Sequence, residues 1–200
     1  MGSGGSLQAL ILVGFPAESN GHAPGSAIRR RWSRPWPFRS GTETIESSFT
    51  CGVDALDRYF REQVGQDVRR RATACYVAID AASGQVAGYD TLAAAGVLLA
   101  DLPKELARRL PRYPSVPVAR LGRLAVDSAY RGRKLGGALL WDAVARSLRP
   151  EIAVFALVVD AKDDRAEAFY RHHGFESFGS LSRQLLLAVT SSLLNEQNSG

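Results

Sequence analysis

One stretch of the chain is more informative than any other, and it reads Leu124-Ala125-Val126-Asp127-Ser128-Ala129-Tyr130-Arg131-Gly132-Arg133-Lys134-Leu135-Gly136-Gly137-Ala138. An apolar segment ends at Val126, a basic loop with glycines follows, and an amphipathic pattern begins near Leu135. We predict a strand, a loop and a helix in that order. The N–H groups and the dipole at the start of a helix attract an anion. The stretch therefore predicts a binding site for a diphosphate.

Sequence patterns on both sides of this stretch predict a mixed α/β chain. Upstream, Leu56, Tyr59, Phe60 and Val64 have helical spacing. The other expected elements are strands at 75–80, 85–92 and 116–126, a short helix at 102–110, a helix ending near 148, and strands at 152–159 and 181–189. Asp164-x-x-Glu167 has the spacing of a capping box, and Gly174 is expected to stop the helix that it opens.

The two ends of the chain differ in composition from its centre. Residues 1–6 have the composition of a flexible leader, and residues up to 44 are rich in Gly, Pro, Ser and Arg. We expect a poorly ordered arm over 1–44, a globular domain over 45–190 and a frayed tail over 191–200. Within the arm, cations and aromatic side chains alternate over 29–39. This pattern is typical of RNA-binding segments, or of an exposed strand or turn whose tryptophans dock on the domain.

Charge and cysteine content narrow the class of protein. The net charge is +5, of which the first 45 residues carry +3, so the domain itself is only mildly basic. Net charge alone therefore does not identify a polyanionic partner. No apolar run approaches the roughly 20 residues of a membrane-spanning helix, so no membrane association is expected. Cys51 and Cys75 predict neither a disulfide framework nor a metal site, and we expect a reduced, cytoplasmic setting.

A second motif follows downstream, and it reads Asp163-x-x-Ala166-x-x-x-Tyr170-x-x-x-Gly174-Phe175. With the loop pattern Arg131-Gly132-Arg133-Lys134-Leu135-Gly136, it resembles the GNAT superfamily of acetyl-CoA-dependent N-acetyltransferases. The resemblance implies the GNAT fold, a mixed and mostly antiparallel central sheet that is splayed at the acetyl-CoA site and flanked by helices. It also implies acetyl-CoA as co-substrate and no metal.

The resemblance assigns roles to particular residues. Tyr170 is the expected catalytic acid, which protonates the CoA sulfur. Lys134 stands where the family usually has glycine, which matters only if that position needs a positive φ. Asp163 stands where the family most often has asparagine. The residues expected to bind acetyl-CoA are Leu124, Ala125, Val126, Arg131, Gly132, Arg133, Lys134, Leu135, Gly136, Gly137 and Asp163.

Further motifs resemble one subgroup of this superfamily, the acetyltransferase toxins of bacterial toxin–antitoxin modules. They are Phe49-x-Cys51-Gly52-x-x-x-Leu56-Asp57-x-Tyr59, Val86-x-Gly88-Tyr89, Gly122-Arg123-Leu124-Ala125-Val126 and Val159-Asp160-Ala161-Lys162-Asp163. The resemblance implies that the acceptor is the α-amino group of aminoacyl-tRNA and that acetylation blocks translation. It also implies a cognate DNA-binding antitoxin and a homodimer. Arg69, Arg70, Arg71 and Arg123 are the candidate tRNA contacts.

Two other functions are compatible with parts of the sequence. A GNAT enzyme that acetylates a small amine or a protein N-terminus fits the mild charge of the domain, but not the Phe49–Tyr59 motif. A non-catalytic module that binds CoA or nucleic acid fits the basic arm, but gives no role to Tyr170. Arg69–Arg71 are also compatible with a simple solvated face.

Overall fold

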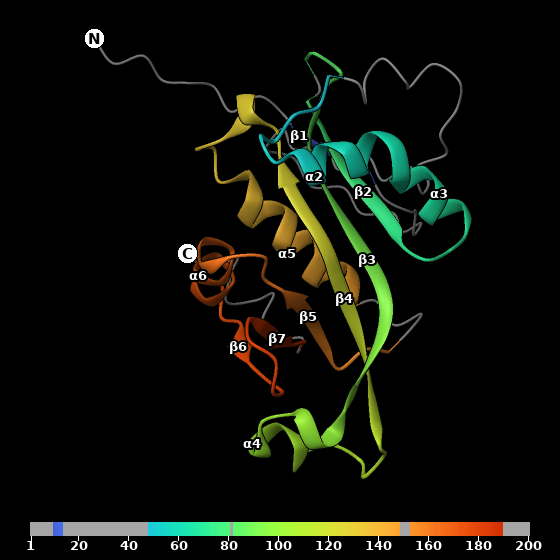
Figure 1. Ribbon diagram of the computed structural model, residues 1–200, viewed down its shortest axis with the longest axis vertical. Coiled ribbons are helices and arrows are strands. Elements are labelled where there is room, and N and C mark those ends of the chain that lie inside the picture. The colour runs from blue at the N-terminus through green and yellow to red at the C-terminus, as the bar shows by residue number, and fades with distance from the viewer. Residues whose placement is uncertain (1–9, 14–47, 81, 149–152, 190–200) are drawn as a thin grey trace, which may run out of the picture. The chain divides into compact units, whose positions relative to one another are not determined.

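The computed structural model describes residues 10–13, 48–80, 82–148 and 153–189 (Figure 1). They divide into two compact units. The first holds the described residues up to Thr91 together with Arg123–Leu139, and the second holds Leu92–Gly122 and the described residues from Leu140 onward. The predicted leader, the basic and aromatic segment at 29–39 and the tail at 191–200 lie outside the described residues.

The first unit contains one end of a sheet whose strands follow the order β1-β2-β3-β4. These are β1 (Leu10–Val13), β2 (Ala74–Asp80), the start of β3 (Val86–Leu98) and the end of β4 (Ser115–Val126). β1 is antiparallel to β2, with Leu10 opposite Asp80. Strand β1 lies in the segment for which the sequence predicted no regular structure, and its backbone pairs with β2.

A helical segment covers one face of this part of the sheet. It consists of α2 (Asp54–Arg58), a π-helical turn η1 (Tyr59–Gln63) and α3 (Val64–Arg69), where the sequence predicted one continuous helix. Side chains from this segment and from the sheet form one buried cluster: Phe49, Cys51, Tyr59, Phe60, Val64, Cys75, Val77, Val86, Tyr89 and Ala125. A separate cluster contains Ala78 and Ala87 of the sheet with Leu135 and Leu139 of α5 (Leu135–Ser147).

The second unit contains strands in the order β3-β4-β5-β7-β6. β5 (Ala156–Asp160) is parallel to β4, and β7 (Gln184–Ala188) is antiparallel both to β5 and to β6 (Glu176–Ser177). One face packs against the connection between β3 and β4, which holds the 3-10 turn η2 (Leu99–Asp101) and helix α4 (Lys104–Ala107). The expectation of a mixed, mostly antiparallel sheet flanked by helices is confirmed.

Strand β3 is longer than the sequence predicted. It continues from Leu92 to Leu98 through Leu92-Ala93-Ala94-Ala95-Gly96, where alanine and glycine give a weak strand signal. Pairing with β4 outweighs this weak preference, and the N–H of Leu99, just after β3, donates to the carbonyl of Pro114, just before β4, at 3.0 Å. In the described part of the chain, no helix is long and apolar enough to cross a membrane.

Candidate active site

The loop after β4 begins with a buried carboxylate that fixes its first turn. Asp127 accepts hydrogen bonds from the backbone N–H groups of Thr50 and Ala129, both at 2.9 Å. Its own N–H donates to the carbonyl of Ala87 at 2.9 Å. Asp127 thereby caps the 3-10 turn η3 (Ser128–Tyr130) and ties it to β3. N–H donors thus satisfy both oxygens of this buried carboxylate.

Arg131 anchors the loop to the segment that precedes α2. Its guanidinium donates to the carbonyl of Cys51, and the N–H of Ser128 donates to the carbonyl of Thr50 at 2.8 Å. Gly52 has a φ of +73°, and a Cβ there would lie 3.0 Å from Nη2 of Arg131. The side chain of this predicted cofactor residue therefore holds the loop in place. The sequence signal for this contact is the Cys51-Gly52 pair of the first toxin-like motif, but no sequence pattern links that pair to Arg131.

The first turn of α5 presents free backbone donors. The first bond of this helix runs from the N–H of Ala138 to the carbonyl of Lys134, at 3.2 Å. The preceding N–H groups belong to Leu135, Gly136 and Gly137, and none of them donates to any described residue. Orphan donors of this kind, with the helix dipole, form an anion site. The predicted diphosphate site therefore has the geometry that its chemistry requires.

Two loop residues adopt the left-handed backbone conformation. Gly132 has a φ of +75° and Lys134 a φ of +59°. This conformation costs a residue with a Cβ about 1 to 2 kcal/mol, and it costs glycine almost nothing. The substitution of lysine for the family's glycine therefore falls on a position that needs a positive φ. The side chain of Lys134 is exposed, beside the free donors of α5.

Positive charge dominates the rest of the loop. The guanidinium of Arg133 lies 5.2 Å from the ring centroid of Tyr130, whose hydroxyl donates to Asp80 at 2.7 Å. The backbone N–H of Ala82 and the hydroxyl of Tyr130 hold the pKa of Asp80 below its ordinary value. Asp80 is thus occupied by hydrogen bonds within the protein, and Arg133 and Lys134 remain exposed to a ligand.

The end of β4 lies between two packed clusters. Ala125 is buried on the side of α2 and α3, and Leu124 and Val126 pack against the cluster that contains the start of α5. A Cβ on Gly88 would lie 2.9 Å from the carbonyl oxygen of Ala125 and 2.9 Å from Cδ1 of Leu139. Glycine at this position lets β3, β4 and α5 approach closely, which explains the second toxin-like motif.

The remaining predicted residues lie in the second unit, around α6 (Asp164–His172). Asp163 is the N-cap of this helix, and its Oδ1 accepts from the N–H of Ala166 at 2.8 Å. That bond and the ion pair with Lys162 lower the pKa of Asp163. The predicted capping box opening at Asp164 is wrong by one residue, because Asp163 caps α6. A carboxylate accepts this bond as well as an asparagine amide oxygen does, so the change from the family residue leaves the cap intact.

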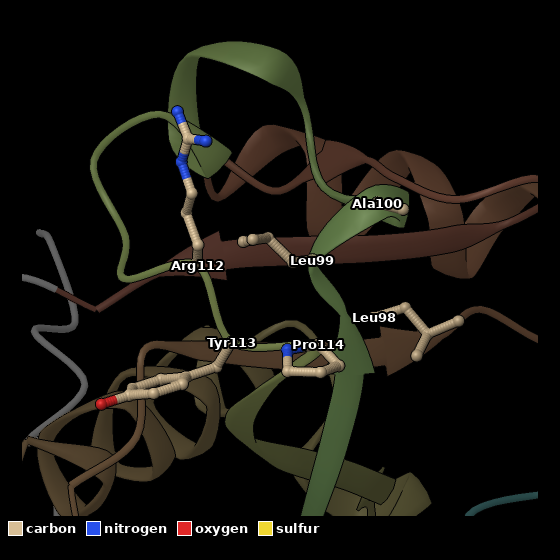
Figure 2. Close-up of a pocket in the computed structure, with 6 residues that line it drawn as sticks. All are labelled: Leu98, Leu99, Ala100, Arg112, Tyr113 and Pro114. Carbon is tan, nitrogen blue, oxygen red and sulfur yellow. The ribbon is translucent and has the colours of Figure 1, made fainter.

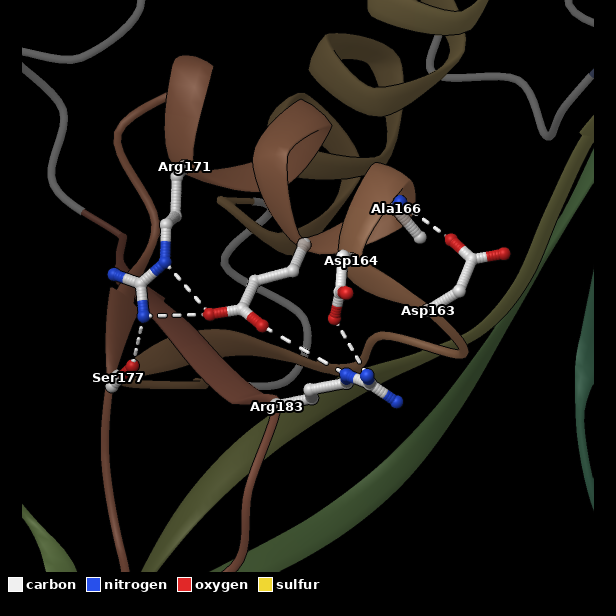
Figure 3. A network of polar contacts seen from close by, with 7 residues as sticks. Asp163, Asp164, Ala166, Arg171, Ser177 and Arg183 are labelled. Carbon is white, nitrogen blue, oxygen red and sulfur yellow. Dashed lines mark hydrogen bonds and ion pairs between the residues drawn. The ribbon is translucent and has the colours of Figure 1, made fainter.

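A polar network fixes α6 against the strands that follow it (Figure 3). Arg171 donates to Glu167 at 2.9 Å and to Ser177 at 2.5 Å. Arg183, whose φ is +62°, donates to Asp164 at 2.6 Å. Asp164 thus contributes an ion pair to the network and not the cap of the helix.

Tyr170 lies on the packed face of α6. Its side chain is buried, and its ring centroid lies 5.2 Å from that of Phe169 and 5.4 Å from that of Phe175. Gly174 has a φ of +85° just after the helix end, as the sequence predicted. The phenol hydroxyl is the one group on this ring that can donate a proton, and the packed ring holds it in a fixed place.

The four candidate tRNA contacts have two different environments. Arg69, Arg70 and Arg71 are exposed at the end of α3, and no ion pair among the described residues involves them. Arg123 is half-buried, and its Cζ lies 3.3 Å from the ring centroid of Tyr59. Arg69, Arg70 and Arg71 are therefore solvated at a helix end, whereas Arg123 is held against the ring of Tyr59.

A shallow apolar cavity of about 610 Å³ lies in the second unit, between the end of β3 and the start of β4 (Figure 2). Its lining residues are Leu98, Leu99, Ala100, Arg112, Tyr113 and Pro114. Arg112 and Tyr113 are its only ionisable groups, and they do not form an acid–base pair suited to acyl transfer. Elsewhere in the described ranges, no group of three or more His, Cys, Asp or Glu side chains could hold a metal ion.

Comparison with known proteins agrees with this geometry. A curated relative is the tRNA-acetylating toxin of Mycobacterium tuberculosis, 38% identical over 142 residues, which are 70% of this chain and 83% of the relative. A solved structure of AtaT complexed with acetyl-methionyl-tRNAfMet has a TM-score of 0.68 at 27% identity, over 76% of this chain and 91% of that one. AtaTR bound with acetyl-CoA has a TM-score of 0.62 at 26% identity, over 76% and 90%.

The family assignment follows from the sequence profile that matches most of the chain. The profile of the acetyltransferase (GNAT) family matches residues 28–175, which contain β4, the basic loop, α5 and α6. The chain belongs to the GNAT family of acetyltransferases.

Proposed function

We propose that the protein transfers the acetyl group of acetyl-CoA to the α-amino group of an aminoacyl-tRNA, and so removes that tRNA from translation. The observation that carries the proposal is the set of free N–H donors of Leu135, Gly136 and Gly137 behind a cationic loop. It is supported by a relative named tRNA-acetylating toxin, by AtaT complexed with acetyl-methionyl-tRNAfMet and by AtaTR bound with acetyl-CoA.

The loop residues fit the diphosphate of acetyl-CoA. The donors of α5 would bind its oxygens, and the exposed cations of Arg133 and Lys134 would balance its charge. Leu124, Ala125 and Val126 would bind the extended part of the molecule along β4. When bound, acetyl-CoA supplies a thioester whose carbonyl carbon is open to attack by an amine.

We assign the proton transfers as follows. The neutral amine nitrogen forms a bond to the carbonyl carbon, and the carbon–sulfur bond breaks. Tyr170 donates its proton to the departing sulfur, and the new amide nitrogen loses a proton to water. A phenol with a pKa near 10 is protonated at neutral pH, so Tyr170 can act as the acid without further activation.

The choice of acceptor needs no strong base in the protein. An α-amino group has a pKa of about 8, against about 10.4 for a lysine side chain, so a usable fraction is neutral at pH 7. We also propose, from the toxin-like motifs, that the protein acts in the cytoplasm, forms a homodimer and is neutralised by a cognate DNA-binding antitoxin.

The direct test uses the purified full chain with labelled acetyl-CoA. The acceptors are total aminoacyl-tRNA, the same tRNA after deacylation, and a small surrogate amine such as an amino-acid amide. We expect rapid labelling of the charged tRNA, slow labelling of the small amine and no labelling of the deacylated tRNA, and mild alkali should release the tRNA label as N-acetyl amino acid. The Tyr170→Phe variant serves as the control for chemistry.

Two results would contradict the proposal. Label on deacylated tRNA would show that the acceptor is not the α-amine. Rapid labelling of the small amine together with an unlabelled tRNA pool would assign the chain to GNAT enzymes that modify small molecules.

A further inference from the structure

The contact between Arg123 and Tyr59 is the most unusual side-chain contact of the first unit. The guanidinium carbon lies 3.3 Å from the ring centroid, which is the distance of direct stacking. Arg123 is half-buried, and its guanidinium makes no hydrogen bond or ion pair with any described residue. One face of the group is therefore covered, and no residue in the described ranges accepts from its N–H groups.

The ring that covers Arg123 is itself fixed. Tyr59 is 3% exposed and belongs to the cluster that contains Phe60 and Tyr89. Its hydroxyl donates to Oδ2 of Asp67 at 3.0 Å. Burial and the bond to Asp67 raise the pKa of Tyr59 to about 12, so the hydroxyl stays protonated and keeps donating. At neutral pH Tyr59 therefore serves as a stacking surface for Arg123 and not as an acid.

The backbone around Tyr59 is specialised as well. Tyr59 opens the π-helical turn η1, which interrupts the helical segment between α2 and α3. At the end of this turn Gln63 has a φ of −115°, far from the value of about −63° in an α-helix. π-helical turns are rare and occur frequently at functional sites. Four features thus converge on one guanidinium: a rare turn, a buried ring, a carboxylate and a stacking contact.

The position of Arg123 along β4 narrows the class of ligand. A strand rises about 3.3 Å per residue, so Arg123 lies about 10 Å along the strand from Val126, on the side away from the cationic loop. The loop already provides the exposed cations of Arg133 and Lys134 for the diphosphate of acetyl-CoA. If acetyl-CoA lies along Leu124–Val126 as proposed, an anion bound at Arg123 would lie beyond the diphosphate, toward the acyl end of the site.

We infer that Arg123 is a phosphate-binding residue for the acceptor, held in position by stacking on Tyr59, and that its ligand is the phosphodiester nearest the 3′ end of tRNA. A guanidinium with one covered face still offers parallel N–H groups along its edge, and these match two phosphate oxygens. The identity of the ligand rests on the proposed function, whereas the presence of a phosphate site rests on the geometry alone. Tyr59 and Asp67 are positioning residues.

The test compares variants in steady-state acetylation of total aminoacyl-tRNA. Arg123→Gln removes the cation, Arg123→Lys keeps the charge without the planar fork, and Arg58→Gln removes an exposed cation from the adjacent helix as a matched control. We expect Arg123→Gln to raise KM for tRNA about tenfold and to lower the salt slope by about one. Arg123→Lys should recover little of this loss, and Arg58→Gln should match the wild type.

Variants of Tyr59 test the positioning. Tyr59→Phe keeps the ring and loses only the bond to Asp67, so we expect a small rise in KM for tRNA. Tyr59→Leu removes the stacking face and should resemble Arg123→Gln, with Kd for acetyl-CoA unchanged. Equal losses for tRNA and for a small surrogate amine would overturn the inference, because they would indicate general damage to the fold.

A binding measurement keeps this inference separate from the proposed function. A fluorescent cytidine-cytidine-adenosine trinucleotide carries the terminal phosphodiesters of tRNA but no amino acid, so its binding needs no acetylation. Weaker binding to Arg123→Gln than to the wild type and Arg58→Gln supports the phosphate site even if the chain acetylates no tRNA. Equal binding by all three proteins, with unchanged KM for tRNA, overturns it.

Discussion

A lysine in the left-handed conformation is the least expected residue of the loop. Lys134, with its φ of +59°, replaces the glycine that the GNAT pattern has at this point. Backbone strain of this kind persists only where the surrounding structure holds it. Here the carbonyl of Lys134 accepts the first hydrogen bond of α5, from the N–H of Ala138, so the start of the helix holds Lys134 in its strained conformation.

Replacing Lys134 by glycine should therefore stabilise the protein. Relief of the left-handed strain outweighs the greater freedom of glycine in the unfolded chain, and we expect the free energy of unfolding to rise by about 1 kcal/mol. Urea titration measures the change. Arg133→Gly is the matched control, since Arg133 has no positive φ, and it should destabilise the protein. A loss of stability in both variants would contradict this account of Lys134.

Asp57 makes the stability of the first unit depend on pH. It is 4% exposed, and its carboxylate accepts from the N–H of Cys51 at 2.8 Å and from the hydroxyl of Thr50 at 2.9 Å. Burial alone would raise its pKa, but these hydrogen bonds outweigh burial and hold the pKa below the ordinary 3.8. The folded state therefore binds this proton less readily than the unfolded state does, and acid weakens folding.

The stability that Asp57 contributes should be complete above pH 3.8 and disappear as the pH falls through its lower value in the folded state. The difference in unfolding free energy between wild type and Asp57→Asn should accordingly shrink below pH 4. Denaturant titration between pH 7 and pH 2 measures it. Asp54→Asn, an exposed carboxylate of the same helix, is the control. A constant difference across this range would exclude the hydrogen-bonded carboxylate as its source.

Tyr170 gives the sharpest test of the chemistry. The Tyr170→Phe variant keeps the ring among Phe169 and Phe175 and removes only the hydroxyl. We expect kcat to fall about 100-fold with Kd for acetyl-CoA nearly unchanged, the pattern of a lost proton donor. The same change at Tyr113, which is 68% exposed, is the control and should leave kcat intact. Full activity in Tyr170→Phe, with chemistry rate-limiting, would make Tyr170 a packing residue only.

Strand β3 contains two glycines, Gly88 and Gly96, and replacing each by alanine should have different effects on stability. At Gly88 the new Cβ would meet the backbone oxygen of Ala125 at 2.9 Å, and at Gly96 it would meet the movable hydroxyl of Ser115 at 2.7 Å. We expect Gly88→Ala to cost about 1 to 3 kcal/mol of stability and Gly96→Ala much less, because only the backbone contact cannot move aside. Thermal unfolding of both variants measures this, and equal losses would refute the close approach.

The elements that the sequence predicted are those with strong local patterns. The expected strand at 75–80 is β2, and the expected strand at 116–126 is β4. Their apolar residues form a local pattern that is typical of a strand and can be read without knowing the partner strand. The end of β3 and the two-residue β6 were missed, since their structure depends on pairing with another strand. The π-helical turn was missed because the apolar spacing at Tyr59, Phe60 and Val64 also fits a regular helix.

The candidate site divides in the same way. The loop from Arg131 to Gly137 was predictable, because a strand, glycines, cations and a helix follow one another in the chain. The bond of Arg131 to Cys51 spans 80 residues, and the stacking of Arg123 on Tyr59 also joins residues that are remote in sequence. No local pattern encodes such contacts, although the toxin-like motifs contain Cys51, Tyr59 and Arg123, and the loop pattern contains Arg131.

The charge of the whole molecule, +5, is spread over several exposed groups, and the three arginines that end α3 are the densest among the described residues. Changing Arg69, Arg70 and Arg71 together to glutamine should raise KM for aminoacyl-tRNA and flatten its salt dependence, because fewer counterions are released on binding. A small surrogate amine should be acetylated as before. The same three substitutions at Arg108, Arg109 and Arg112 are the control for lost charge, and an equal effect from both sets would mean that α3 binds no tRNA.

The π-helical turn also limits how the length of this segment can vary. Successive residues of an α-helix are rotated by about 100° about the helix axis. Losing or gaining one residue between Tyr59 and Gln63 would therefore rotate the side chains before this point relative to those after it. Either the ring of Tyr59 would lose its contact with the guanidinium of Arg123, or the hydroxyl of Tyr59 would lose its hydrogen bond to Asp67. Single-residue insertions and deletions in η1 should thus impair the protein even where substitutions at its exposed positions are tolerated.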